Sequence, residues 1–107
     1  MKDKTIDGLK ITNQFRSRTG FVYDLLCRGD RLVLGIAPRE NPADPGEWCV
    51  EARTGARDPD PIVGWGATKR DALRQAGIAW VASARERPLP AFDWDAVAMV
   101  LAEVRAV

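Results

Sequence analysis

Four stretches of the chain have the residue pattern of β-strands, three with side chains that divide between two faces with a period of two residues and one that is short and β-prone. These stretches are 21–27, 32–37, 48–53 and the shorter 62–65. In the first of them Phe21, Tyr23, Leu25 and Cys27 fall on one face, as the pleat of a β-strand requires. The pattern therefore predicts three or four strands, the fourth of them at an edge of the sheet.

The segments between these stretches carry turn and loop residues. Gly29-Asp30, between the first two strands, predicts a two-residue hairpin turn of the primed kind, so these strands should pair antiparallel. Residues 38–46 contain three prolines and 54–61 contain two. Both segments are predicted to be loops, because proline cannot donate a ladder hydrogen bond. Residues 1–20 are polar with scattered apolar positions, which predicts a frayed arm or an irregular strand.

Beyond residue 67 the apolar spacing changes to that of α-helices. The helical positions of the first such segment are Ala72, Leu73, Ala76, Ala79, Trp80 and Ala84. Thr68 and Asp93 stand where capping residues stand, which predicts helices over about 68–85 and from 93 to about 105. Strands first and helices last predict an α+β fold, a three- to four-stranded antiparallel sheet followed by two C-terminal helices packed on one face.

Composition narrows the function classes. The 107 residues, 46% of them hydrophobic, fit one domain over 1–107. There is no histidine, which removes the commonest general base and metal ligand. Cys27 and Cys49 form no CxxC pair, so we expect two small buried thiols and no zinc site, and Asp58 and Asp60 alone are too few for a cation site. We therefore predict a protein that is not an enzyme and needs no cofactor.

The chain shows no pattern of membrane insertion or export. No apolar run approaches the roughly 20 residues that cross a bilayer. Residues 1–10 mix charges with single apolar residues and lack the continuous apolar centre of a signal peptide. These observations predict a cytoplasmic protein without a membrane partner.

Charge is balanced overall but uneven along the chain. Sixteen Lys and Arg against fifteen Asp and Glu argue against a binder held mainly by electrostatics. Residues 68–87 carry five basic and two acidic residues, with Lys69, Arg70 and Arg74 at the start of the first predicted helix. Three interpretations stay open for this cluster: plain solvated surface, a site for an acidic protein partner, or a phosphate or nucleic-acid site.

Four tryptophans are many for a chain of this length. Each buries a large area, so at least two should anchor the core and one can lie exposed. An exposed tryptophan beside basic side chains is a binding hot spot candidate, because Trp and Arg dominate such sites. The predicted partner-binding residues are Trp65, Lys69, Arg70 and Arg74.

The segment 64–76, G-W-G-A-T-K-R-D-A-L-R-Q-A, resembles the G-x-T-x-x-E-A-L-x-x-A entry into the helix of HicB-like antitoxin domains. The strand, proline-rich loop and strand before it are similar to that family's order, so the likeness covers about half of the chain. Asp71 stands where the family usually has Glu. The resemblance implies a β-β-β-α core and a protein partner.

Over about twenty residues the same segment also resembles the last motif of double-stranded RNA-binding domains, which would place Lys69, Arg70 and Arg74 on phosphates. The G-W-G at 64–66 lacks the full spacing of a phosphate-binding loop and predicts a tight turn. The leading hypothesis is a small non-catalytic, HicB-like module that binds a protein. The alternatives are a nucleic-acid-binding module and a structural subunit, a homodimer joined by the apolar face of 94–104.

Overall fold

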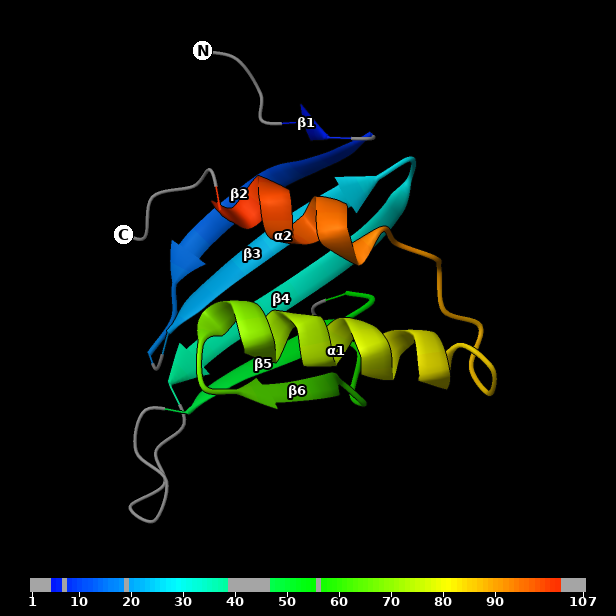
Figure 1. The fold of residues 1–107 in the computed structure, drawn as a ribbon. Helices are drawn as coiled ribbons and strands as arrows, with labels where there is room; N and C mark the ends of the chain where they lie inside the picture. Colours follow the sequence, from blue (N-terminus) through cyan, green and yellow to red (C-terminus); the bar gives the residue numbers. More distant parts are fainter. Residues whose placement is uncertain (1–4, 7, 19, 39–46, 56, 103–107) are drawn as a thin grey trace.

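The computed structural model describes residues 5–6, 8–18, 20–38, 47–55 and 57–102. One antiparallel sheet holds six strands, each beside its neighbours in sequence. The strands are β1 (Thr5–Ile6), β2 (Leu9–Arg16), β3 (Phe21–Cys27), β4 (Asp30–Pro38), β5 (Trp48–Arg53) and β6 (Ile62–Gly66). Two helices follow, α1 (Lys69–Ser83) and α2 (Trp94–Ala102), on one face of the sheet (Figure 1). This confirms the predicted α+β class and the order of strands before helices.

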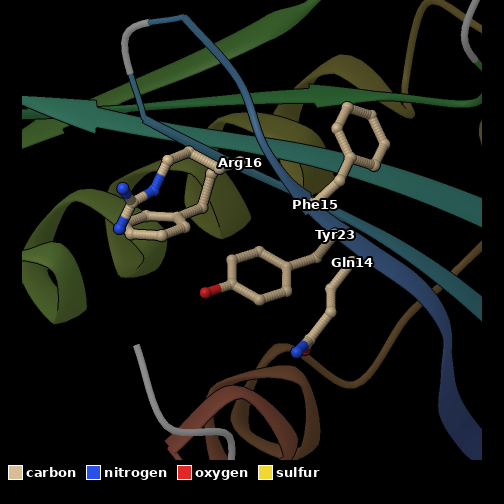
Figure 2. A pocket seen from close by; sticks show the side chains of 5 residues that line it. Gln14, Phe15, Arg16 and Tyr23 are labelled. Carbon is tan, nitrogen blue, oxygen red and sulfur yellow. The ribbon is translucent and has the colours of Figure 1, made fainter. Parts of the chain in front are cut away.

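The sheet has more strands than the three or four expected, because β1 and β2 come from the predicted N-terminal arm. A bulge between Ile11 and Asn13 interrupts the alternation of β2. Because a bulge adds one residue, it reverses the faces of the side chains that follow. Gln14 and Phe15 project to opposite sides of the strand beyond it, and Phe15 is 53% exposed on the face without helices (Figure 2). The irregular spacing in this segment is therefore a bulged strand.

The β3–β4 hairpin has the predicted kind of turn, shifted by one residue. Cys27 pairs with Asp30, so the loop consists of Arg28 and Gly29 rather than Gly29 and Asp30. Both loop residues have positive φ, 51° for Arg28 and 90° for Gly29. A two-residue primed turn needs such values, and glycine adopts them without steric cost.

The core is one layer of apolar side chains between the sheet and the helices. Its largest fully buried members are Trp80, Leu25, Leu32, Leu34, Val50, Val97 and Val100. Trp80 comes from the last turn of α1, and Trp48 and Trp94 pack against the buried cluster. The tryptophans therefore anchor the core as expected, with Trp65 as the exposed one at 43%.

Gly64 and Gly66 lie inside β6 and not in a tight turn as predicted. Their role is close contact between strand and helix. A Cβ built on Gly64 would lie 2.2 Å from the backbone nitrogen of Ala76, and one on Gly66 would lie 2.5 Å from that of Ala72. The absence of side chains at both positions therefore lets the backbone of α1 rest directly on β6.

Both helices begin at the predicted capping residues. The Thr68 hydroxyl accepts a hydrogen bond from the backbone N–H of Asp71 at 3.0 Å. The Asp93 carboxylate accepts from the backbone N–H groups of Asp95 and Ala96 at 3.1 and 3.2 Å. α1 ends at Ser83, slightly before the predicted end, whereas the predicted end of the second helix near 105 lies outside the described residues.

Candidate functional site

The two helices leave a groove between them. α1 contacts β5 and β6, and α2 contacts β1 and β2, on the same face of the sheet (Figure 1). Between them Leu25, Leu32 and Leu34 are buried in the core, and the groove lies over the part of β3 and β4 that carries Tyr23 and Ile36. The groove has a volume of about 950 Å³, and Tyr23 of β3 and Ile36 of β4 form its floor. We call it the interhelical groove.

One stripe of side chains along α1 forms the first wall. Arg70, Arg74, Ile78 and Val81 line the groove, and their spacing of four, four and three residues puts them on one helix face. The stripe is basic in its first half and apolar in its second, where Ile78 and Val81 are 56% and 59% exposed. The groove therefore has a basic end and an apolar end.

The second wall is the side of α2 that carries Asp95, Ala98, Met99 and Ala102. Met99 is 57% exposed, whereas the alanines are small and leave the groove wide. The two helices run in opposite directions (Figure 1). Asp95 therefore lies toward the apolar end of the α1 stripe, and Ala102 toward its basic end.

An aromatic cluster lies where the two helices meet, and Gly77 and Trp94 of this contact line the groove. A Cβ built on Gly77 of α1 would lie 2.7 Å from Cγ of Trp94, so only glycine permits this contact. Trp80, Phe92 and Trp94 pack together with ring centroids 5.6 to 6.4 Å apart. The Trp80 indole N–H donates to the Pro90 carbonyl at 2.8 Å, whereas the Trp94 indole nitrogen is buried without a hydrogen-bond partner among the described residues.

Aromatic rings position cations at the basic end of the groove. Nζ of Lys69 lies 4.9 Å from the ring centroid of Trp48 and 5.5 Å from that of Phe21. Cζ of Arg16 lies 5.6 Å from the Phe21 centroid, and Figure 2 shows its guanidinium over a ring beside Tyr23. Contacts of this kind position a cation while leaving it charged. Burial raises the pKa of the neighbouring Tyr23 hydroxyl above its ordinary value, so Tyr23 is a neutral hydrogen-bonding group here.

Three of the four predicted partner-binding residues come together. Lys69, Arg70 and Arg74 line the interhelical groove. Trp65 pairs with Cys49 on β5, and its neighbours in β6 face α1, so its side chain lies on the opposite face of the sheet. The structure therefore separates Trp65 from the basic cluster next to it in sequence.

Sequence reasoning missed the apolar part of the site. Ile78 and Val81 lie off the helical face formed by Ala72, Leu73, Ala76 and Trp80, and that mismatch was the available signal. Most of the apolar face of α2, in contrast, is already used inside the molecule. Its residues Ala96, Val97 and Val100 are buried against the sheet.

The acidic pair in the 54–61 loop is structural. The Asp58 carboxylate accepts from the backbone N–H groups of Asp60 and Thr54 at 3.0 and 3.2 Å, and Arg87 lies 3.6 Å away. The hydrogen bond from Asp60, supported by Thr54 and Arg87, lowers the pKa of Asp58. Within the described part of the chain, no three His, Cys, Asp or Glu side chains gather as a metal site would require.

The two cysteines lie on opposite faces of the sheet. Cys27 packs against the helix-side core, whereas Cys49 shares the other face with Trp65. Each is partly exposed, so the expectation of two buried thiols was wrong. Their strands, β3 and β5, are separated by β4.

Comparisons with models of protein families, with curated proteins and with solved structures found no match. None of the described helices is both long enough and apolar enough to cross a membrane.

Proposed function

We propose that this protein is a small non-catalytic module that acts in the cytoplasm and binds a segment of a protein partner in the interhelical groove. One observation carries the proposal. Five large apolar residues are exposed in the described part of the chain, and three of them, Ile78, Val81 and Met99, line this groove. Single exposed apolar side chains are ordinary, but an apolar patch with a polar rim is typical of an interaction site.

The placement of polar groups supports binding rather than chemistry. Lys69, Arg70, Arg74 and Asp95 belong to the helices and are exposed at the rim of the groove. A catalytic site usually needs polar groups that converge on one point within a pocket. In this groove the floor is formed by Ile36 and one tyrosine, an arrangement suited to covering an apolar segment.

The HicB-like resemblance of 64–76 is compatible with this proposal, since the same residues begin α1 and supply the basic rim. We propose that the module is HicB-like. The nucleic-acid alternative uses the same basic residues. A double-stranded RNA-binding domain begins with a helix, whereas the described residues before Phe21 form β1 and β2.

A photo-crosslinking amino acid at position 78 tests the proposal in living cells. Position 15 on the other face of the sheet is the matched control, because Phe15 and Ile78 are exposed to a similar degree, 53% and 56%. We expect adducts with another protein from position 78, unchanged by nuclease, and few from position 15. Adducts from position 15 alone, adducts that nuclease removes, or adducts with a second copy alone would overturn the proposal.

A further inference from the structure

We infer that the occupant of the interhelical groove is an acidic amphipathic α-helix of the partner, with its acidic end beside Arg70 and Arg74. This inference rests on the proposed function and adds the conformation and the charge of the bound segment. It is carried by the backbone pairing of the floor, the spacing of the two walls and the uneven charge along α1.

The floor of the groove favours a helix over an extended segment. Its strands β3 and β4 are interior strands, paired on both sides, so they offer no open ladder to another strand. The walls near the floor are apolar as well. A segment that enters must therefore satisfy its own backbone hydrogen bonds, which an α-helix does and an extended chain does not.

The spacing of the walls also fits a helix. α1 lies against the β5–β6 pair and α2 against the β1–β2 pair. Neighbouring strands are roughly 4.8 Å apart, so the centres of the two pairs are about 19 Å apart along the sheet. Packed helices need about 8–10 Å between their axes. The basic end of the groove is thus wide enough for one further helix, which passes over the Gly77–Trp94 contact toward Ile78 and Val81.

The charge along the walls sets the chemistry of the occupant. Arg70 and Arg74 are exposed and form no ion pair with any described residue. They lie in the first half of the α1 stripe, and Asp95 lies toward the second half. Acidic side chains of a bound helix are therefore favoured at the basic end of the groove and disfavoured at its apolar end, beside Asp95. The apolar face of that helix would cover Ile78, Val81 and Met99.

Synthetic helical peptides test the inference directly. The first probe is a lactam-bridged peptide of about 18 residues, long enough to stay helical, with leucines at i, i+3, i+4 and i+7 and glutamates at one end. The second probe replaces the glutamates by lysines, and the third keeps the glutamates but has a central proline. Binding to the full chain is measured by fluorescence anisotropy. We expect the acidic helix to bind and both other probes to bind at least about tenfold more weakly.

Two variants with matched controls locate the binding. We expect Arg70→Glu/Arg74→Glu to weaken the acidic probe at least about tenfold and to improve the lysine probe, because the charge of the rim is reversed. Arg85→Glu, an exposed change beyond the end of α1, should leave both affinities unchanged. Ile78→Ser/Val81→Ser should also weaken the acidic probe, whereas Phe15→Ser should not. Circular dichroism checks that every variant is folded.

The outcomes separate the inference from the proposed function. If Ile78→Ser/Val81→Ser weakens binding but the acidic and lysine probes bind alike, the groove binds protein and the acidic occupant is wrong. Equal binding of the proline probe would overturn the helical conformation. If neither groove variant matters, both proposals fail. Competition by a short RNA duplex for Arg70 and Arg74, or self-association lost in Ile78→Ser/Val81→Ser, would replace the helix with nucleic acid or a second copy.

Discussion

The two helices cover the same face of one sheet but are attached to it in different ways. α1 contacts β6 through backbone, because Gly64 and Gly66 leave no side chain between them. It is also held at both ends, by the Thr68 cap and by Arg87, which donates to the Asp60 carbonyl at 3.0 Å. α1 is therefore the fixed wall of the interhelical groove.

α2 is attached through side chains. Ala96, Val97 and Val100 are buried under it, and its first residue, Trp94, packs on Gly77 of α1. Its other side, with Met99 exposed, faces the groove. The difference teaches that glycines in a strand let a helix backbone lie directly against it, whereas a helix without such glycines is attached by its buried side chains.

The largest effect should come from the contact between α1 and β6. In Gly64→Val the new Cβ would lie 2.2 and 2.3 Å from backbone atoms of Ala76 and Ala72. The backbone of α1 would have to move away from β6 to relieve these contacts. We expect a loss of at least about 3 kcal/mol in the free energy of unfolding, measured with urea. Gly35→Val is the control, because nothing lies within 4 Å of its Cβ. Equal stability of the two variants would refute the backbone contact.

The second largest loss of stability is expected when Trp80 of the aromatic cluster is replaced, and Trp94 of the same cluster provides the comparison. Trp80→Phe leaves the Pro90 carbonyl without its 2.8 Å hydrogen bond and opens a cavity in the core. We expect a loss of about 2 kcal/mol in the free energy of unfolding. Trp94→Phe should cost clearly less, because its indole nitrogen has no partner among the described residues. The comparison fails if Trp94→Phe is the more destabilising change.

Removal of the N-caps should loosen the two helices over different lengths. Thr68→Ala and Asp93→Ala each remove acceptors of backbone N–H groups, and each should cost about 1 kcal/mol. Hydrogen exchange is expected to accelerate throughout the first turns of α2 in Asp93→Ala, because side-chain packing does not fix the backbone of that helix against a strand. In Thr68→Ala, α1 should keep its local protection through β6. Identical exchange patterns would argue against the difference in attachment.

The smallest effect concerns the loop that holds the exit of α1. The pKa of Asp58 is lowered in the folded protein by the Asp60 and Thr54 N–H groups and by Arg87. Its stabilising effect is therefore present above the unfolded value, about 3.9, and is lost as the pH falls through the folded value. The urea concentration at the midpoint of unfolding should be measured between pH 6 and 2. Toward the acid end it should fall less steeply in Asp58→Asn than in the wild type. Glu86→Gln, an exposed change in the α1 exit, should keep the wild-type slope.

Local patterns in the sequence determined much of the fold. The alternation in 21–27 and 48–53 predicted β3 and β5 with their observed bounds, and Thr68 and Asp93 predicted the helix starts. These features depend on neighbours within a few residues. The basic part of the site was predictable for the same reason, since Arg70 and Arg74 share a helix face wherever the helix lies.

Features that depend on distant contacts were decided by the tertiary structure. The bulge in β2 turned Phe15 to the outer face, and the contact with α1 made a strand of the glycines at 64–66 and sent Trp65 to the other side. The groove itself needs two helices placed on different strands of one sheet. Periodicity states which side chains share a face, but what covers that face is set by elements far away in the sequence. Periodicity places Ile78 and Val81 off the core face of α1, but the tertiary structure decided that they line one groove with Met99.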